Sequence, residues 1–182
     1  MAKENVKTLL SQSIRTYSGD ELKGYIVIVP STSWQTKRWP AEYFGALITG
    51  LQIPSVITGG DADKEIAQKV MDSSKGNGID LSGRTNLKEL VALIAGAKAV
   101  VSNDSGPLHI AVALNIPVVA LFGPTDPEKT GPYGWNRPGA YGLTVLRSPL
   151  NCSPCFKKTC KEPICMSSIP VKTVFEELRK YL

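Results

Sequence analysis

The sequence predicts an α/β fold with a doubly wound, all-parallel sheet of the Rossmann-like kind. Apolar segments typical of strands alternate with segments of helical periodicity along almost the whole chain. Each strand–helix unit takes about 20–25 residues, a spacing that favours right-handed crossovers between parallel strands. The first strand segment, residues 25–29, is a continuous run rich in β-branched residues, as expected for a strand buried on both faces.

The other elements follow in order. The expected strands are residues 25–29, 55–58, 79–81, 98–102, 117–122 and 143–146. The expected helices are residues 6–14, 40–51, a segment that starts near residue 61, and residues 86–94, 105–114 and 170–182. Ser18-Gly19-Asp20 predicts a turn, and Asn86 with Glu89 has the pattern of a capping box. The Gly- and Pro-rich stretch 123–147 predicts a long loop, and the sixth strand lies near its end.

Composition excludes several classes of protein. With 42% hydrophobic and 20% charged residues, the 182-residue chain is not of the disordered type, and its length suggests one domain. It has neither an apolar run long enough for a membrane span nor the apolar N-terminal region of a secretory signal. The net charge of +5 suits an anionic ligand but is too small to indicate nucleic acid by itself.

Polar residues follow the first predicted strand at its carboxyl end, where open parallel sheets bind ligands. Thr32, Ser33, Lys37 and Arg38 bring hydroxyls and cations close to a helix N-terminus, which is what a phosphate needs. The alternative is a Ser-rich turn whose basic side chains are solvated. On either view Lys37 is expected to be solvated, so removing it should hardly change the stability of the fold.

Similar residues follow three more strands. Gly59-Gly60 after the second strand would let a ligand approach the backbone, although a simple βα turn is the alternative, and no G-x-G-x-x-G fingerprint is present. After the fourth strand, Asp104, Ser105, Gly106 and His109 stand together, beyond what an N-cap requires. His109 alone would be a core histidine more often than a ligand-binding one. After the fifth strand, Thr125 and Asp126 can reach the same crevice.

The four cysteines are Cys152, Cys155, Cys160 and Cys165, with the spacing of a zinc knuckle. A structural zinc, two disulfides and free thiols are the alternatives. Lys157, Lys158 and Lys161 lie between them, so a second hypothesis is a metal-stapled module that binds nucleic acid rather than an enzyme. If the polar residues at the strand ends bind a ligand, this Cys-rich loop, residues 151–166, is expected to belong to the scaffold and to lie away from the ligand crevice.

Three motifs carry a resemblance to a known family. They are Lys37-Arg38-Trp39-Pro40, Asn103-Asp104-Ser105-Gly106-Pro107-Leu108-His109 and Phe122-Gly123-Pro124-Thr125-Asp126-Pro127. In this order and spacing the chain resembles the C-terminal half of the family 9 glycosyltransferases, the ADP-heptose:lipopolysaccharide heptosyltransferases. The resemblance implies the GT-B fold, in which the C-terminal domain binds the nucleotide-sugar donor. A nucleotide-sugar epimerase half is an alternative, because that fold is shared.

The resemblance also implies roles for single residues. Thr32, Ser33 and Lys37 would hold the donor diphosphate, Glu65 the ribose, and the backbone near Thr85 the adenine. Asp104 would grip the sugar hydroxyls, the amides of Ser105 and Gly106 would bind phosphate, His109 would lie beside them, and Thr125 and Asp126 would complete the donor site. Lys37 and Asp104 are the expected catalytic residues, and transfer with inversion would need no cofactor because Lys37 and a helix N-terminus stabilise the leaving group.

The resemblance implies a particular domain organisation as well. Residues 1–23 are expected to be a helical lead-in, and residues 24–182 the nucleotide-sugar-binding domain with the Cys-rich loop and the C-terminal helix. The catalytic base and the site for the lipopolysaccharide core acceptor would belong to an N-terminal domain outside this sequence, so this half alone would be inactive. The complete enzyme is expected in the cytoplasm, as a peripheral protein of the inner membrane, with no nucleic-acid partner.

Overall fold

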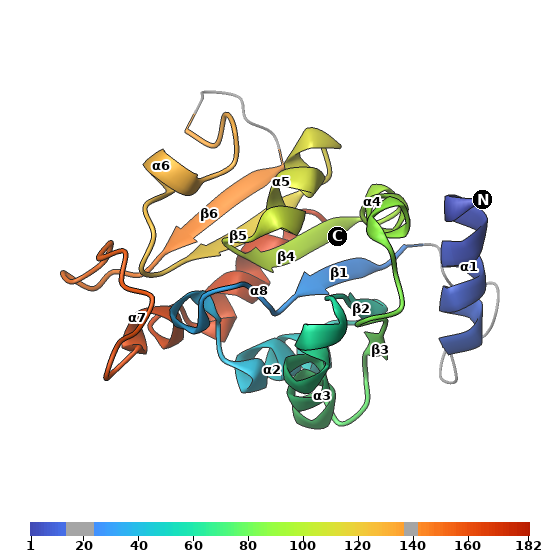
Figure 1. Ribbon diagram of the computed structural model, residues 1–182, viewed down its shortest axis with the longest axis horizontal. Coiled ribbons are helices and arrows are strands. Elements are labelled where there is room, and N and C mark those ends of the chain that lie inside the picture. Colours follow the sequence, from blue (N-terminus) through green and yellow to red (C-terminus); the bar gives the residue numbers. More distant parts are fainter. Residues whose placement is uncertain (14–23, 137–141) are drawn as a thin grey trace.

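The computed structural model describes residues 1–13, 24–136 and 142–182, and its centre is one six-stranded parallel sheet (Figure 1). The strands are β1 (Ile26–Val29), β2 (Ser55–Ile57), β3 (Ile79–Asp80), β4 (Ala99–Asn103), β5 (Val118–Phe122) and β6 (Leu143–Arg147). Their order is β3-β2-β1-β4-β5-β6, and every neighbouring pair is parallel. The prediction of a doubly wound parallel sheet is therefore confirmed. The order reverses between β1 and β4, which is where such sheets bind ligands.

Each helix expected from the sequence is present. The helical elements are α1 (Ala2–Ser13), η1 (Gln35–Lys37), α2 (Ala41–Gly50), η2 (Asp61–Asp63), α3 (Lys64–Ser73), α4 (Leu87–Ala95), α5 (Gly106–Ala113), α6 (Pro127–Thr130), α7 (Ile164–Ser167) and α8 (Val171–Arg179). Asn86 and Glu89 form the expected capping box, since each side chain accepts a hydrogen bond from the other's backbone amide. The short elements η1, α6 and α7 were not predicted. Ile14 and the expected turn at residues 18–20 lie outside the described residues.

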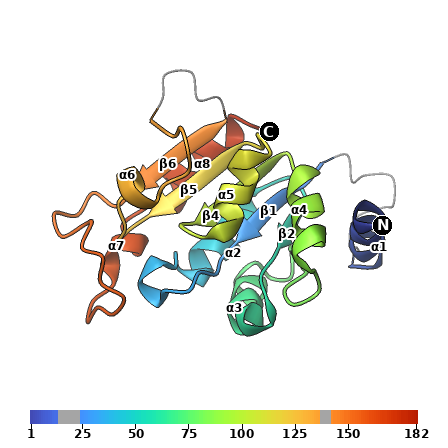
Figure 2. The same ribbon diagram turned by 45° about the horizontal axis from the view of Figure 1, so that its top comes forward.

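Helices cover both faces of the sheet (Figures 1 and 2). Ile26 and Ile28 of β1 pack against the cluster that includes α2, α3 and α8. The alternate residues Val27 and Val29 belong to the second cluster, which includes α1, α4 and α5. This alternation follows from the two-residue period of a strand and explains why β1 is apolar at every position.

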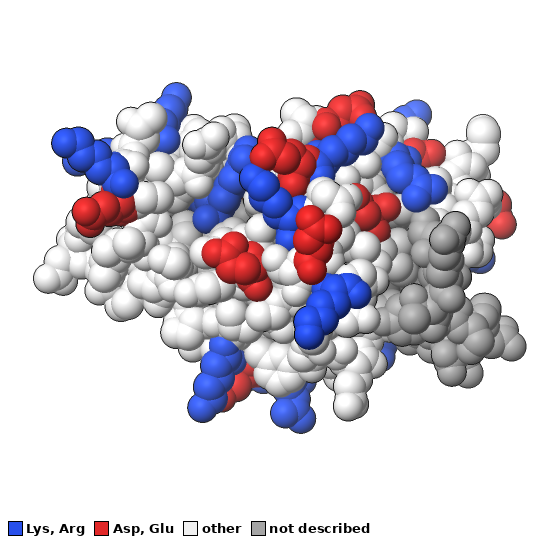
Figure 3. Space-filling view, turned by 90° about the horizontal axis from the view of Figure 1, so that it is seen from below, with Lys and Arg blue, Asp and Glu red and all other residues white. Residues whose placement is uncertain are grey.

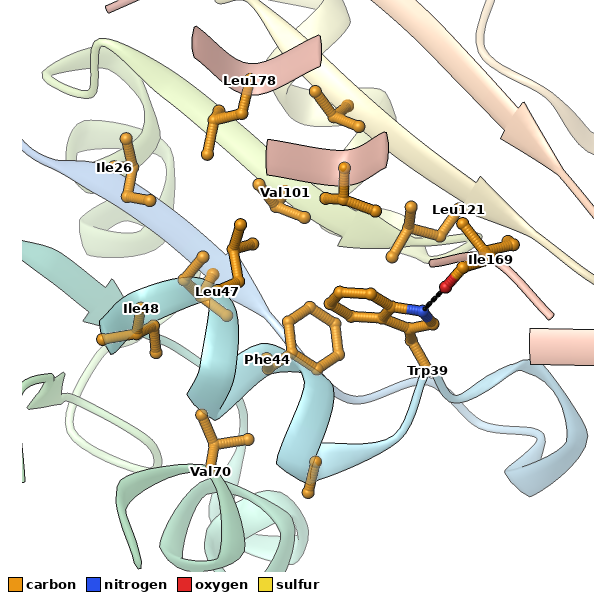
Figure 4. Packing of buried hydrophobic residues seen from close by; sticks show 14 of the residues in the cluster. Ile26, Trp39, Phe44, Leu47, Ile48, Val70, Val101, Leu121, Ile169 and Leu178 are labelled. Atoms are coloured by element: carbon orange, nitrogen blue, oxygen red, sulfur yellow. Dashed lines mark hydrogen bonds between the residues drawn. The ribbon is translucent and has the colours of Figure 1, made fainter. Parts of the chain in front are cut away.

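Trp39 joins the first of these clusters to the C-terminal segment of the chain. Its ring is fully buried, and its indole Nε1 donates a hydrogen bond to the carbonyl of Ile169 at 3.0 Å (Figure 4). The backbone N–H of Trp39 donates to Oδ1 of buried Asn103, whose amide in turn donates to the carbonyl of Pro30. Asn103 therefore cross-links the segments that follow β1 and β4, and both segments line the candidate site.

None of the helices in residues 1–13, 24–136 and 142–182 is long and apolar enough to cross a bilayer. On the face shown in Figure 3, basic and acidic side chains are interspersed rather than gathered into one basic stripe.

Candidate functional site

A pocket of about 1100 Å³ lies at the carboxyl edge of the sheet, where the segments after the strands come together. Nine of the residues predicted for the site line it: Thr32, Ser33, Lys37, Thr85, Asp104, Ser105, Gly106, His109 and Thr125. They come from four separate parts of the chain. The crevice position inferred from the sequence is thus the position of the pocket, as expected for a parallel sheet whose strands all end at one edge.

Asp104 is the buried charge of this pocket. Its Oδ2 atom accepts hydrogen bonds from Lys37 Nζ at 3.1 Å, Thr125 Oγ1 at 2.8 Å and Thr130 Oγ1 at 3.2 Å. The Asp104 and Lys37 side chains are only 6% and 13% exposed, and burying charges to this extent requires such partners. The Oδ1 atom of Asp104 has no hydrogen bond within the described part of the chain, so it can accept one from a ligand hydroxyl.

The segment after β1 contacts Asp104 through the hydroxyl of Thr32 and the ammonium group of Lys37. Thr32 Oγ1 donates to the carbonyl of Asp104 at 3.0 Å, and Arg38 Nε donates to the carbonyl of Thr32 at 3.1 Å. Lys37 also lies over the ring of Trp34, 5.0 Å from its centroid. The expectation of a solvated Lys37 is therefore wrong. Its ammonium group is held between a carboxylate and an aromatic face.

The N-terminus of α5 provides backbone donors at the same point. Ser105 is extended, the helix begins at Gly106, and both residues line the pocket. A side chain at Gly106 would meet no atom within 4 Å, so the backbone is open to a ligand here. Unpaired amides and the helix dipole favour an anion at such a terminus. His109 is exposed and lines the pocket, so it is not a core histidine.

Glu65, the expected ribose ligand, lies outside the pocket. Its carboxylate is exposed, pairs with Lys69 Nζ at 2.7 Å and does not line the pocket. The hydrogen bond from Lys69 lowers the pKa of Glu65 below its usual value. Asp63 lines the pocket instead, and its Oδ2 accepts from the backbone N–H of Gly60 at 2.8 Å. The buried hydroxyl of Thr58, also in the pocket wall, has no hydrogen-bond partner among the described residues.

Asp126 is not a pocket residue either. It caps α6 by accepting a hydrogen bond from the backbone N–H of Glu128. Its Oδ1 atom also lies 3.7 Å from Nη2 of Arg147. Lys129 and Thr130, carried by α6, line the pocket and were not predicted. The dipeptide Asp126-Pro127 could have indicated the start of α6, because an Asp N-cap followed by Pro is a common beginning of a helix.

The Cys-rich loop holds free thiols in this structure. Cys152, Cys155 and Cys160 are exposed and Cys165 is buried, with no disulfide among them. Burial raises the pKa of the Cys165 thiol. The described ranges contain no group of three or more His, Cys, Asp or Glu side chains suited to a metal ion, so the structural zinc suggested by the spacing is not supported.

The loop does not lie where it was expected. The backbone N–H groups of Cys155 and Phe156 donate to the carbonyl of Pro124 at 3.1 and 2.7 Å, and Thr36 Oγ1 donates to the carbonyl of Lys157 at 2.8 Å. Phe156 lines the pocket. The prediction that the loop lies away from the crevice is wrong, because these contacts attach it to the pocket edge.

The sheet order and the polar pocket at the switch point define a Rossmann-like domain of the kind found in GT-B glycosyltransferases. Residues 2–165 match the sequence profile of glycosyltransferase family 9 (heptosyltransferase). The chain belongs to this family.

Individual relatives agree with this assignment. Lipopolysaccharide heptosyltransferase 1 of Pseudomonas aeruginosa is 34% identical over 143 residues, which are 75% of this chain and 37% of the relative. Lipooligosaccharide heptosyltransferase 2 of Campylobacter jejuni is 33% identical over 152 residues, 79% of this chain and 46% of the relative. The solved structure of E. coli ADP-heptose lipopolysaccharide heptosyltransferase II matches with a TM-score of 0.76 and 26% identity, over 98% of this chain and 51% of that one. The chain thus spans less than half of the curated relatives described here.

Proposed function

We propose that residues 24–182 form the donor-binding domain of an inverting, metal-independent glycosyltransferase that transfers heptose from an ADP-heptose-like donor to a lipopolysaccharide core acceptor. In this proposal residues 1–23 lead into the domain. The observation that carries it is the placement of Asp104 and Lys37 beside the open N-terminus of α5. A sugar carrying a diphosphate needs an acceptor for its hydroxyls next to a cationic, amide-rich place for its phosphates, and these three features supply both.

The pocket divides along its length into parts suited to the parts of such a donor. Gly59, Gly60, Asp63 and Thr85 line the part next to β2 and α4, which would take the nucleoside. Ser33, Lys37 and Gly106 would contact the diphosphate. Asp104 would accept from sugar hydroxyls through Oδ1, because its Oδ2 is already occupied.

These residues would act on the leaving group. As the glycosidic bond breaks, negative charge grows on the diphosphate oxygen that leaves. Lys37 and the amides at the start of α5 are fixed before the reaction, so they stabilise that charge without reorganisation. The base that removes the proton of the acceptor hydroxyl, and the acceptor site itself, would come from an N-terminal domain, as in enzymes with two facing Rossmann-like domains. This chain alone would bind the donor and transfer little or no sugar, and the complete enzyme would work in the cytoplasm.

Calorimetry with four ligands tests the proposal. ADP-heptose should bind more tightly than ADP, and ADP more tightly than UDP or UDP-glucose. EDTA should leave ADP binding unchanged, because the cationic groups of the site are Lys37 and backbone amides. A chain that binds none of the four ligands, or that binds ADP only with added magnesium, would contradict the proposal.

A further inference from the structure

Thr58 carries a buried hydroxyl that the donor contacts described above do not use. The residue directly follows β2, and only 2% of its surface is exposed. Its Oγ1 atom has no hydrogen-bond partner among the described residues, although Thr58 lines the pocket. Most buried hydroxyls have a partner, because an unpaired one gives up its bonds to water without replacement. The missing partner of Thr58 therefore requires an explanation.

The sheet fixes the backbone on both sides of Thr58. The N–H of Thr58 donates to the carbonyl of Ile28 in β1 at 3.0 Å. On the other side, the N–H of Leu81 donates to the carbonyl of Ile57 at 2.9 Å, which continues the ladder beyond the end of β3. The position of the threonine is therefore set by three adjacent strands rather than by a loop, so a partner has to come to the hydroxyl.

The side chains beside the hydroxyl are apolar. Side chains alternate between the two faces of a strand, which places Thr58 on the face of Val56, in the second hydrophobic cluster. Val29 and Leu81 flank Thr58 in the sheet and belong to that cluster as well, and Leu90 of α4 packs against it. None of these side chains can donate or accept a hydrogen bond. A buried water needs about two to four polar partners, so water is a poor partner for Oγ1 here.

The same part of the pocket offers an apolar surface to a ligand. Leu87 and Leu90 of α4 line the pocket together with Val29 and Thr58, and 69% of the surface of Leu87 is exposed. Ligand sites typically combine such apolar walls with a few polar groups that fix the orientation of the ligand. A nucleobase matches this combination, because its flat face packs against leucine side chains while its edge carries hydrogen-bonding groups.

We infer that Thr58 is a specificity-determining residue whose hydroxyl forms a hydrogen bond with the edge of the donor's nucleobase. This inference rests on the proposed function, in which the part of the pocket next to β2 and α4 takes the nucleoside. Oγ1 is enclosed in this conformation, and rotation about χ1 to another staggered position turns it toward the pocket when a base is bound. A hydroxyl both donates and accepts, so it can pair with the amino group or with a ring nitrogen of adenine.

The alternative is a threonine with a purely structural role. Threonine has nearly the shape of valine, and β-branched residues are favoured in strands, so Thr58 would then pack as a valine does with an unused hydroxyl. The two roles differ in one measurable respect. Removal of the hydroxyl weakens nucleotide binding only if the hydroxyl contacts the ligand.

Thr58→Val is the direct test, because it removes the hydroxyl and keeps the shape. Its melting temperature without ligand should be unchanged or higher, since the lost hydroxyl has no partner in the fold. Its affinity for ADP, measured by calorimetry, should fall by about three- to tenfold, as expected for one neutral hydrogen bond. Thr58→Ser restores a hydroxyl and should bind ADP more tightly than Thr58→Val. Ribose 5-phosphate lacks a base and should titrate the unsubstituted chain and Thr58→Val alike in NMR experiments.

Ser82→Ala is the matched control. Ser82 lies two residues after β3, is 4% exposed and also has a buried hydroxyl without a partner among the described residues, but it does not line the pocket. Its substitution removes a comparable hydroxyl from outside the site. The affinity for ADP should therefore stay unchanged.

Four results would overturn the inference while leaving the proposed function intact. They are an unchanged affinity of Thr58→Val for ADP, an equal loss for ADP and ribose 5-phosphate, no recovery in Thr58→Ser, and a lower melting temperature of Thr58→Val, which would mean that the hydroxyl has a partner within the fold. Failure of the unsubstituted chain to bind ADP is a different result. It would contradict the proposed function, and the role of Thr58 with it.

Discussion

The ammonium group of Lys37 lies 3.1 Å from Oδ2 of Asp104, and both side chains are largely buried at the pocket. Asp104 therefore pairs with the cation that a phosphate would need, and Lys37 neutralises a carboxylate that burial would otherwise destabilise. Under the proposed function, a donor diphosphate at Lys37 would share this cation with Asp104. The pair would then couple the phosphate part of the site to the sugar part.

The first prediction concerns Lys37→Ala. We expect ADP affinity to decrease by a factor between several-fold and a hundredfold, because a charge-assisted contact with phosphate is worth about 1.5–3 kcal/mol. The free energy of unfolding should also fall, by about 1–3 kcal/mol, because Asp104 is left buried without its cation; this is below the full cost for a completely buried pair. Calorimetry measures the first effect and urea unfolding the second.

Lys69→Ala is the matched control, because Lys69 forms an ion pair with Glu65 in which both side chains are exposed to solvent. It should leave both the free energy of unfolding and ADP binding essentially unchanged, because solvent screens an exposed ion pair. A Lys37→Ala variant that behaves like this control in both measurements would show that the pair contributes neither to binding nor to stability.

The second prediction is that Asp104→Asn separates the two halves of the donor. The amide keeps the size of the side chain but removes the charge, so Lys37 becomes free for phosphate while the sugar hydroxyls lose a charged acceptor. Binding of plain ADP should persist or strengthen, and the additional affinity of ADP-heptose over ADP should disappear. Equal losses for both ligands in calorimetry would mean that Asp104 supports the pocket wall rather than the sugar.

The third prediction concerns Trp39→Phe. Trp39 is fully buried, packs edge-to-face with Phe44 at 4.8 Å between ring centroids, and donates to the carbonyl of Ile169. The smaller ring leaves a cavity and an unpaired carbonyl, so the free energy of unfolding should fall by about 2–4 kcal/mol. Trp34→Phe, at a half-buried position on the pocket edge, should cost less than about 1 kcal/mol. Equal costs in urea unfolding would contradict the anchoring role of Trp39.

The strands and the location of the pocket could be predicted because both depend on local patterns. The β-branched runs and the helical periodicity report burial residue by residue, and in a parallel sheet the segments after the strands must meet at one edge. The capping box at Asn86 was predicted for the same reason, since its two partners are three residues apart. Nine of the predicted site residues line the pocket, and of these Thr85 was expected only from the family resemblance.

The remaining features depend on contacts between distant segments. The pairing of Lys37 with Asp104 joins residues 67 positions apart, so no local pattern indicated that Lys37 would be buried. Asp63 lines the pocket while Glu65, two positions along, is exposed in the first turn of α3, and only the exact start of that helix decides between them. The position of the Cys-rich loop depends on backbone bonds to Pro124, which the sequence does not reveal.

The fourth prediction is a loss of stability at alkaline pH that depends on Tyr25. Burial raises the pKa of this phenol to about 12, and its hydroxyl donates to the carbonyl of Leu93 at 2.7 Å. In the unfolded chain the phenol ionises near pH 10, so above that pH the unfolded state holds fewer protons and becomes favoured. This contribution is complete below pH 10 and is lost as the pH rises toward 12.

Tyr25→Phe isolates that contribution. The variant should be less stable at pH 8 because the hydrogen bond is gone, but its free energy of unfolding should fall less steeply between pH 10 and 11 than that of the unsubstituted chain. Lysine titration affects both proteins alike and cancels in the comparison. If the free energy of unfolding depended on pH in the same way for both proteins, Tyr25 would ionise equally easily in the folded and the unfolded chain.

The last prediction concerns the reactivity of the four thiols. Cys152, Cys155 and Cys160 are exposed, so they should react quickly with a thiol reagent, whereas Cys165 should react slowly because it is buried and its pKa is raised by that burial. Elemental analysis of the folded protein should find no metal bound to the chain. Timed labelling followed by mass spectrometry of peptides identifies the slow position.

Substitution of the same cysteines tests whether they stabilise the fold. Cys155→Ser and Cys160→Ser should leave the melting temperature unchanged, because exposed free thiols make few contacts, and Cys165→Ser should lower it, because a hydroxyl replaces sulfur in a buried cluster that includes Met166 and Ile169. Four equally fast thiols would mean that the loop opens readily from the pocket edge. A metal or disulfide whose removal melts the protein would mean that the cysteines anchor the loop, and that the hydrogen bonds to Pro124 are not sufficient to hold it.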